Sequence, residues 1–134
     1  MREELQKKLI DIAPYMFRYE GWNDLQQSLM GFGFEIGDGW YGILEDLITK
    51  IKNIDIDKVV KVIQIKEKFG GLRFYINGGW DELYDLIDAA EVESYKMCDQ
   101  CGNTDGVTQN KTGWIQTLCP KCRLKRENVE SSPS

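Results

Sequence analysis

The sequence of 134 residues contains no histidine. Histidine is the usual general acid or base near neutral pH and the commonest metal ligand in proteins. Its absence excludes the Ser-His and Cys-His pairs on which many nucleophilic enzymes depend, and any metal site has to be built from other side chains. We therefore expect a protein that acts without catalysis.

Long apolar runs are also missing. No stretch approaches the roughly 18 apolar residues that a membrane-spanning helix needs. The first residues, MREELQKKLIDIA, lack the uninterrupted apolar core and the small-residue cleavage site of a signal peptide. With 42% hydrophobic and 29% charged residues, the composition is that of an ordinary globular domain. We expect a cytoplasmic protein with no membrane partner.

Cysteine is absent from the first 97 residues, and then four cysteines follow in the pattern C-x2-C-x17-C-x2-C. Two CxxC turns at such a spacing are typical of a structural zinc site, in which four thiolates complete a tetrahedron. Two disulfides or a redox CxxC fit a cytoplasmic chain less well, whereas iron remains an alternative metal. We expect Zn2+ as a structural cofactor, bound by Cys98, Cys101, Cys119 and Cys122.

The pattern predicts a zinc ribbon over residues 98–123. Val107 and the pair Trp114–Ile115 are the expected strands on either side of a polar turn, and metal binding would supply the folding energy of so small a loop. Residues 124–134 are expected to form a disordered tail.

Apolar periodicity predicts the elements of residues 1–97. Leu5, Leu9, Ile12 and Met16 mark one helix face that Pro14 ends or kinks, and a short helix is expected around 22–30. Asp38 is the expected cap of a helix whose apolar stripe runs from Trp40 to Ile51. A β-hairpin at 59–77 and a helix from Trp80 to Ala90 follow. The predicted fold is α+β: helices packed on an antiparallel hairpin or small sheet, followed by the ribbon.

The hairpin concentrates positive charge, because residues 58–76 carry five bases and one acid in a chain of net charge −5. A two-residue turn at Gly70-Gly71 places Lys68 opposite Arg73 and directs Phe69, Leu72, Phe74 and Ile76 inward. The opposite face then carries Lys66, Lys68, Arg73 and Tyr75. This cluster fits a phosphate and a base or ring, or it is a solvated sheet face paired with acids of residues 81–93.

Two further surfaces can each be interpreted as a binding site or as a purely structural feature. Lys121, Arg123, Lys125 and Arg126 follow the last cysteines and suit nucleic acid or a protein partner, or form a basic frayed end. In GFGFEIGDGW (31–40), Glu35 and Asp38 form an acid pair suited to a cation, or they serve as cap and turn residues.

Three stretches together resemble a family of small proteins encoded by bacteriophages and prophages: GFEIGDGWYGILEDL (33–47), QIKEKFGGLRFYI (64–76) and GWIQTLCPKC (113–122). The resemblance carries over no catalytic residue. It implies a phage accessory protein in the cytoplasm of a bacterial host cell that binds a host protein and thereby inhibits a defence system.

Two other functions stay open. The ribbon and the hairpin face are suited to nucleic acid. Lys68, Arg73, Tyr75 and Trp114 would also suit a nucleotide, as in a sponge for a nucleotide signal. The residues expected to contact a ligand or partner are Lys66, Lys68, Arg73, Tyr75, Trp114, Lys121 and Arg123.

Overall fold

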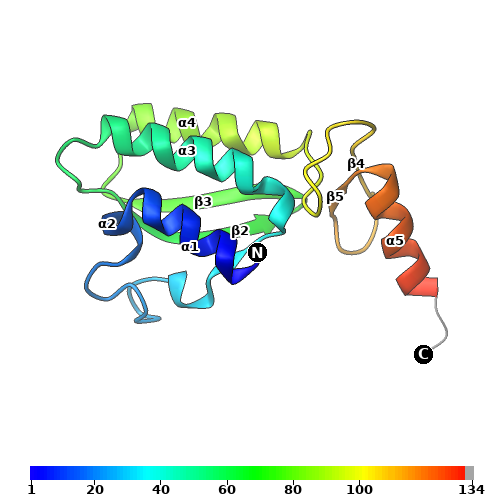
Figure 1. Cartoon of the computed structure of the whole chain (residues 1–134), viewed down its shortest axis with the longest axis horizontal. Coiled ribbons are helices and arrows are strands. Elements are labelled where there is room, and N and C mark those ends of the chain that lie inside the picture. Colours follow the sequence, from blue (N-terminus) through cyan, green and yellow to red (C-terminus); the bar gives the residue numbers. More distant parts are fainter. Residues whose placement is uncertain (132–134) are drawn as a thin grey trace.

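The computed structural model describes residues 1–131 and has the predicted α+β architecture (Figure 1). The helices are α1 (Glu3–Ile12), α2 (Pro14–Phe17), α3 (Tyr41–Ile54), α4 (Asp81–Ser94) and α5 (Pro120–Ser131), with 3-10 turns η1 (Met30–Phe32) and η2 (Asp38–Trp40). The strands are β1 (Phe34–Glu35), β2 (Lys61–Lys68), β3 (Gly71–Asn77), β4 (Thr108–Gln109) and β5 (Thr117–Leu118). Within the described residues, no helix is long and apolar enough to cross a membrane.

A mixed three-stranded sheet in the order β1-β2-β3 organises the larger part of the chain. The predicted hairpin of β2 and β3 is antiparallel, and the short β1 adds to it in parallel. Side chains alternate between the two faces of a sheet. The row Phe34–Ile65–Phe74 is accordingly buried, and the neighbouring row Glu35–Lys66–Arg73 lies on the other face.

One core lies between the sheet and the helices that cover it, α3 and α4 above it and α1 in front in the view of Figure 1. The predicted stripe of α3 is buried, and Trp40 at its start is fully buried. Each large side chain of this kind contributes about 1.5–3 kcal/mol on burial. The core is therefore built by helical periodicity, as the sequence predicts.

The start of α3 differs from the prediction, because Asp38 makes no capping bond to it. The Asp38 carboxylate instead accepts a bond from the backbone N–H of Arg2 at 2.8 Å and pairs with the Arg2 guanidinium, also at 2.8 Å. The acid thus joins the start of α1 to the GDGW stretch.

The turn of the hairpin also differs from the predicted one. The turn residues are Phe69 and Gly70, so Lys68 pairs with Gly71 and Lys66 with Arg73. Gly71 is the first residue of β3 and pairs with Lys68, and it has to be glycine because a Cβ there would lie 2.3 Å from the hydroxyl oxygen of Tyr95. The predicted faces of β2 and β3 are otherwise retained, with Leu72 and Phe74 buried, but Phe69 is exposed.

Two further segments differ from expectation. The helix expected around 22–30 is wrong: turns occupy most of that segment, and its last residue opens η1. Asp24 holds these turns, since its carboxylate accepts bonds from the Gln26 N–H and the Gln27 side chain. Where a disordered tail was expected over 124–134, α5 continues to Ser131, and residues 132–134 lie outside the described part of the chain.

Asp55, just after α3, is a buried carboxylate that joins three parts of the fold. It accepts hydrogen bonds from the Tyr15 hydroxyl at 2.7 Å and from the backbone N–H groups of Val59 and Val60, each at 3.0 Å. Burial tends to raise the pKa of Asp55, but these hydrogen bonds lower it below its usual value. The carboxylate is thus ionised and satisfied inside the protein.

Candidate metal centre

Two cysteine turns form the centre at the end of the molecule where the ribbon, residues 98–123, lies (Figure 1). In the first turn the Gly102 N–H donates to the Cys98 carbonyl at 2.9 Å, and Gly102 has a φ of +80°, which glycine adopts without strain. The second turn opens α5, and there the Cys122 N–H donates to the Cys119 sulfur at 3.5 Å. Each CxxC is therefore a knuckle closed by its own backbone.

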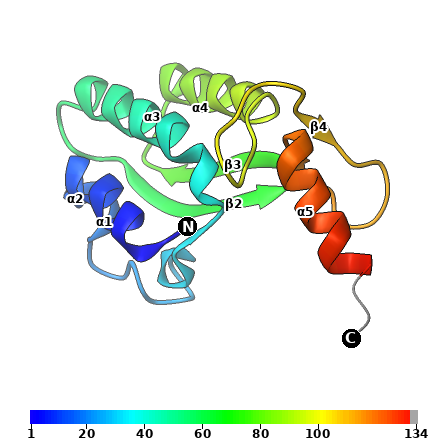
Figure 2. The same ribbon diagram turned by 45° about the vertical axis from the view of Figure 1, so that its right-hand side comes forward.

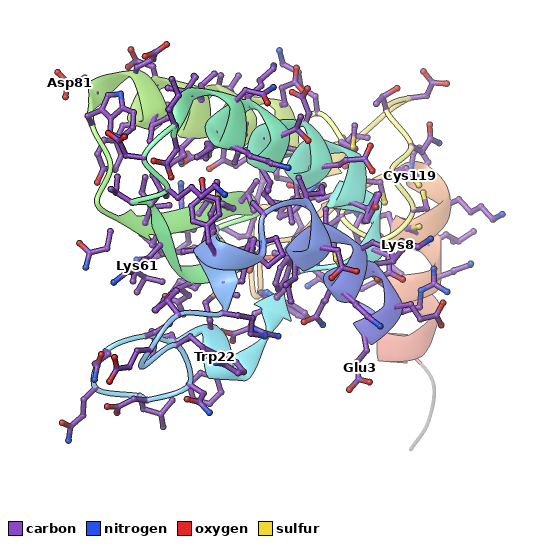
Figure 3. The ribbon with its side chains drawn as sticks, turned by 60° about the vertical axis from the view of Figure 1, so that its left-hand side comes forward. Glu3, Lys8, Trp22, Lys61, Asp81 and Cys119 are labelled. Carbon is purple, nitrogen blue, oxygen red and sulfur yellow. The ribbon has the colours of Figure 1, made fainter. Side chains whose placement is uncertain are left out.

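The four sulfur atoms lie within 4.8 Å of one another. The Sγ atoms of Cys101 and Cys119 are 3.6 Å apart, close to the roughly 3.8 Å edge of a tetrahedron with 2.3 Å metal–sulfur bonds. Cys98 and Cys119 are buried, Cys122 is half-buried and Cys101 is exposed. The four cysteines can hold a metal ion, as predicted, and a four-sulfur set leaves no open coordination position (Figure 3 labels Cys119).

The thiols influence one another's ionisation strongly. The backbone N–H of Cys122 is the main reason that the pKa of Cys119 is lowered to about 6, whereas burial and the neighbouring thiols raise the pKa of Cys122 to about 12. Four thiolates this close repel one another, so a cation is what allows all of them to ionise together.

The first knuckle packs against the GDGW stretch, residues 37–40. A Cβ on Gly37 would lie 2.1 Å from the Asp99 carbonyl oxygen, and one on Gly39 would lie 2.1 Å from that of Cys98. The Gly39 N–H donates to the Asp99 carbonyl at 2.8 Å, and the Trp40 indole N–H donates to the Met97 carbonyl, also at 2.8 Å. The two glycines are therefore required by a backbone-to-backbone contact.

Asp99, inside the first CxxC, is buried at this contact and accepts a bond from the Gly37 N–H at 2.8 Å. Burial raises the pKa of Asp99, partly offset by the bonds from Gly37 and Gln100. Sequence analysis did not single out Asp99, whose one available signal is its position inside the first CxxC, between Cys98 and Cys101.

The tip of the hairpin packs against the ribbon from the other side. The buried hydroxyl of Thr117 donates to the Gly70 carbonyl at 2.5 Å, and the Gln109 amide donates to that hydroxyl at 3.1 Å and to the Tyr95 carbonyl at 2.8 Å. Figure 2 shows the end of β2 and the start of β3 beside the ribbon. The paired strands of the ribbon are Thr108–Gln109 and Thr117–Leu118, not those predicted at Val107 and Trp114–Ile115.

The predicted basic cluster does share one face of the hairpin, but Arg73 is committed within the fold. Its guanidinium pairs with the Glu91 carboxylate and lies 3.5 Å from the Tyr95 hydroxyl. This pairing matches the structural alternative, in which acids of residues 81–93 neutralise the face. Lys68 and Tyr75 remain exposed and Lys66 is half-buried.

In the second basic patch, at residues 121–126, the arginines are bonded within the ribbon and the lysines are exposed. Arg123 donates to the carbonyls of Thr108 and Gln116 and to the Asn110 side chain, and Arg126 donates to Asn110 and to the Trp114 carbonyl. These bonds fasten α5 to the polar loop of the ribbon. Lys121 and Lys125 are exposed.

Trp114 is 67% exposed and lies between two hollows. The first, of about 510 Å3, is lined by Trp114, by Gln100 and Gln116, by Met1 and Arg2, and by the carboxylate residues Glu35, Asp38, Glu67 and Asp99; we call it the acidic cleft because carboxylates outnumber cations there, Arg2 being paired with Asp38. The second, of about 680 Å3, shares Trp114, Gln100 and Gln116 and adds Cys101, Leu118, Cys122, Lys125 and Arg126; we call it the basic groove. Sequence reasoning found Glu35, Asp38 and Trp114, but not the glutamines or Glu67.

The acids of the acidic cleft do not form a metal site. Among the described residues, only the four cysteines bring three or more potential ligands within metal-binding distance. Comparison of the chain with family models, curated proteins and solved structures finds no match.

Proposed function

We propose that the chain is a non-enzymatic binding protein whose ribbon is built around one structural zinc ion. The observation that carries this proposal is the closed set of four cysteine sulfurs within 4.8 Å. Zinc with four thiolates is structural when no coordination position is left for water or substrate. The spacing of the two knuckles favours zinc over iron.

We further propose that the partner is a protein of a bacterial host and that the chain is a phage accessory protein acting on a defence component in the cytoplasm. The resemblance of residues 33–47, 64–76 and 113–122 to phage-encoded proteins supports this origin. A binding role is supported by the exposed Trp114 beside the metal centre, because tryptophan is enriched among residues that dominate protein interfaces.

Nucleic acid is the second candidate, favoured by Lys125, which lines the basic groove with Trp114, and by the exposed Lys121 at the start of α5. It predicts binding to single-stranded DNA or RNA that weakens steeply with salt. A nucleotide sponge at the hairpin face is supported less well, because Arg73 would have to leave Glu91 to meet a phosphate.

Native mass spectrometry of the chain expressed in a bacterial host tests the proposal. We expect one zinc ion per chain, retained in the folded protein and released on acid unfolding, together with a co-purifying protein in stoichiometric amount. The matched control is Cys119→Ser, which removes a ligand. Iron in place of zinc, or zinc binding that survives this substitution unchanged, would contradict the proposed centre; a partner-free chain would contradict the binding role.

A further inference from the structure

The tip of the hairpin carries a side chain that stability does not explain. Phe69 has a φ of +55° and is 66% exposed. Positive φ is unfavourable for a bulky residue, and two-residue hairpin turns of this kind favour Asn or Gly at that position. The ammonium of Lys68 lies 5.6 Å from the centroid of the Phe69 ring. The fold thus holds an exposed phenyl ring at a conformational cost.

Trp114 shows the same combination of a fixed backbone and an exposed ring. Its carbonyl accepts hydrogen bonds at 2.8 Å from the side chains of Asn110 and Arg126, so the loop around it is held in place. The Arg126 guanidinium lies 5.9 Å from the centroid of the indole. The indole is nevertheless more exposed than any of the core aromatics.

These two aromatic residues lie on adjoining segments. Gly70, next to Phe69, is in contact with the ribbon at Ile115, next to Trp114: a Cβ on Gly70 would lie 3.2 Å from the Ile115 side chain. At the seam between hairpin tip and ribbon, the segment that carries Phe69 therefore lies against the segment that carries Trp114, and Glu67 of the same tip lines the acidic cleft with Trp114.

Charge differs between the two sides of Trp114. The acidic cleft holds the carboxylates of Glu35, Glu67 and Asp99 beside the Arg2–Asp38 ion pair, and the basic groove is lined by Lys125, Arg126 and the buried Leu118. Cys101 and Cys122 also line the groove, and their thiolates offset its two cations. A ligand that crosses the indole therefore meets negative charge at one end and a nearly neutral groove with apolar side chains at the other.

We propose that the seam of Phe69 and Trp114, with the acidic cleft and the basic groove, binds an extended segment of a partner protein. The segment presents a basic side chain to the acidic cleft, an apolar side chain to the two aromatic rings, and a second apolar side chain to the basic groove. Charge complementarity identifies this occupant, and exposed aromatic anchors are the usual centres of such interfaces. The inference rests on the proposed binding function and locates its site.

A nucleic acid fits the seam less well, although both rings and Lys125 would suit one. The carboxylates of the acidic cleft repel phosphates at one end of the seam. Four thiolates around a divalent zinc carry a net charge of about −2, which offsets part of the positive charge around the basic groove.

The test selects binders to the zinc-loaded full chain from a displayed library of random dodecapeptides. We expect enriched peptides to carry Lys or Arg on one side of two apolar residues, in one fixed order along the peptide. Trp114→Ala weakens their binding about 30-fold, as expected for a central anchor. Glu35→Lys selects against the basic residue, and Val92→Ala, an exposed apolar change on α4, leaves binding unchanged.

Phe69→Asn separates binding from folding. Asn tolerates positive φ, so this substitution raises the melting temperature by about 3 °C while it weakens peptide binding about tenfold. A structural role for Phe69 would move both quantities in the same direction.

Three results would overturn the inference: no enrichment over the unselected library, selected peptides that bind the Trp114→Ala variant equally well, or oligothymidylate that binds the seam more tightly than the selected peptides. The first two leave the proposed function standing if native mass spectrometry still finds zinc and a protein partner, because the partner then binds elsewhere.

Discussion

Gly39 offers the sharpest test of how the ribbon is joined to the rest of the chain. Gly39→Ala would place a methyl group 2.1 Å from the Cys98 carbonyl oxygen and 2.5 Å from the Gly102 nitrogen, both backbone atoms of the first knuckle. Ordinary contacts at such a Cβ begin near 3.4 Å, so the knuckle has to move by more than an ångström. That movement breaks the Gly39–Asp99 backbone bond and strains the Trp40–Met97 bond.

The expected loss combines overpacking of about 1–3 kcal/mol with about 1 kcal/mol for each hydrogen bond lost. We expect Gly39→Ala to lower the free energy of unfolding by about 3 kcal/mol. With a urea slope of about 1.5 kcal/mol per M, the midpoint falls by about 2 M. Zinc transfer to a chromophoric chelator is expected to speed up in the same variant, because the ribbon has lost the surface against which it packs.

Gly42→Ala is the matched control. Gly42 lies in α3, three residues further along, with nothing within 4 Å of the position of its Cβ. Alanine there stabilises the helix by about 0.5–1 kcal/mol. The reasoning fails if Gly39→Ala unfolds within about 0.5 kcal/mol of the original protein, or if Gly42→Ala is destabilised to the same extent.

Three further outcomes are expected. Thr117→Val keeps the shape of the side chain but leaves the Gly70 carbonyl unpaired, and should lower the free energy of unfolding in urea by about 1–2 kcal/mol. An unchanged urea midpoint would show that the Thr117–Gly70 hydrogen bond does not stabilise the fold. Because the pKa of Asp55 is lowered on folding, its contribution to stability is present above about pH 3.9, the unfolded value, and is lost as pH falls through the folded value. Asp55→Asn should therefore cost about 2–3 kcal/mol at pH 7 and flatten the acid limb of the stability curve, whereas the exposed Asp46→Asn should leave that limb unchanged. Removal of zinc by a chelator should increase hydrogen exchange at the Gly39 amide, and protection that persists in the metal-free protein would show that the knuckle does not need the metal to hold its contact.

Much of the fold could be predicted from the periodic spacing of apolar residues in the sequence. The stripe from Ile43 to Ile51 is buried as predicted, and the β-branched run before Gly70 is a strand. Both predictions can be made without knowing which distant residues pack against these elements, because the spacing of the apolar residues indicates which face is buried. The two CxxC motifs likewise predict the sulfur cluster, since tetrahedral coordination requires four ligands to meet.

The glycines could not be interpreted from sequence in the same way. Gly70-Gly71 has the sequence signature of a turn, yet Gly71 is a strand residue that makes room for Tyr95, and the turn begins at Phe69. Gly39 likewise serves a contact with a segment about sixty residues away. A single sequence distinguishes a glycine needed for its φ angle from one needed for its lack of a side chain only when the neighbour in space is known.

The long separation between the GDGW stretch and the knuckle it receives has a consequence for synthesis. Chains are made from the N-terminus at about 5–20 residues per second, so Cys122 is added roughly 4–17 s after Gly39. During that interval the sheet and α3 are able to assemble, but the surface around Gly39 has no knuckle against it. The core is therefore nearly complete before the first knuckle is made, and the supply of the metal ion that the four cysteines bind sets how soon the knuckle closes against it.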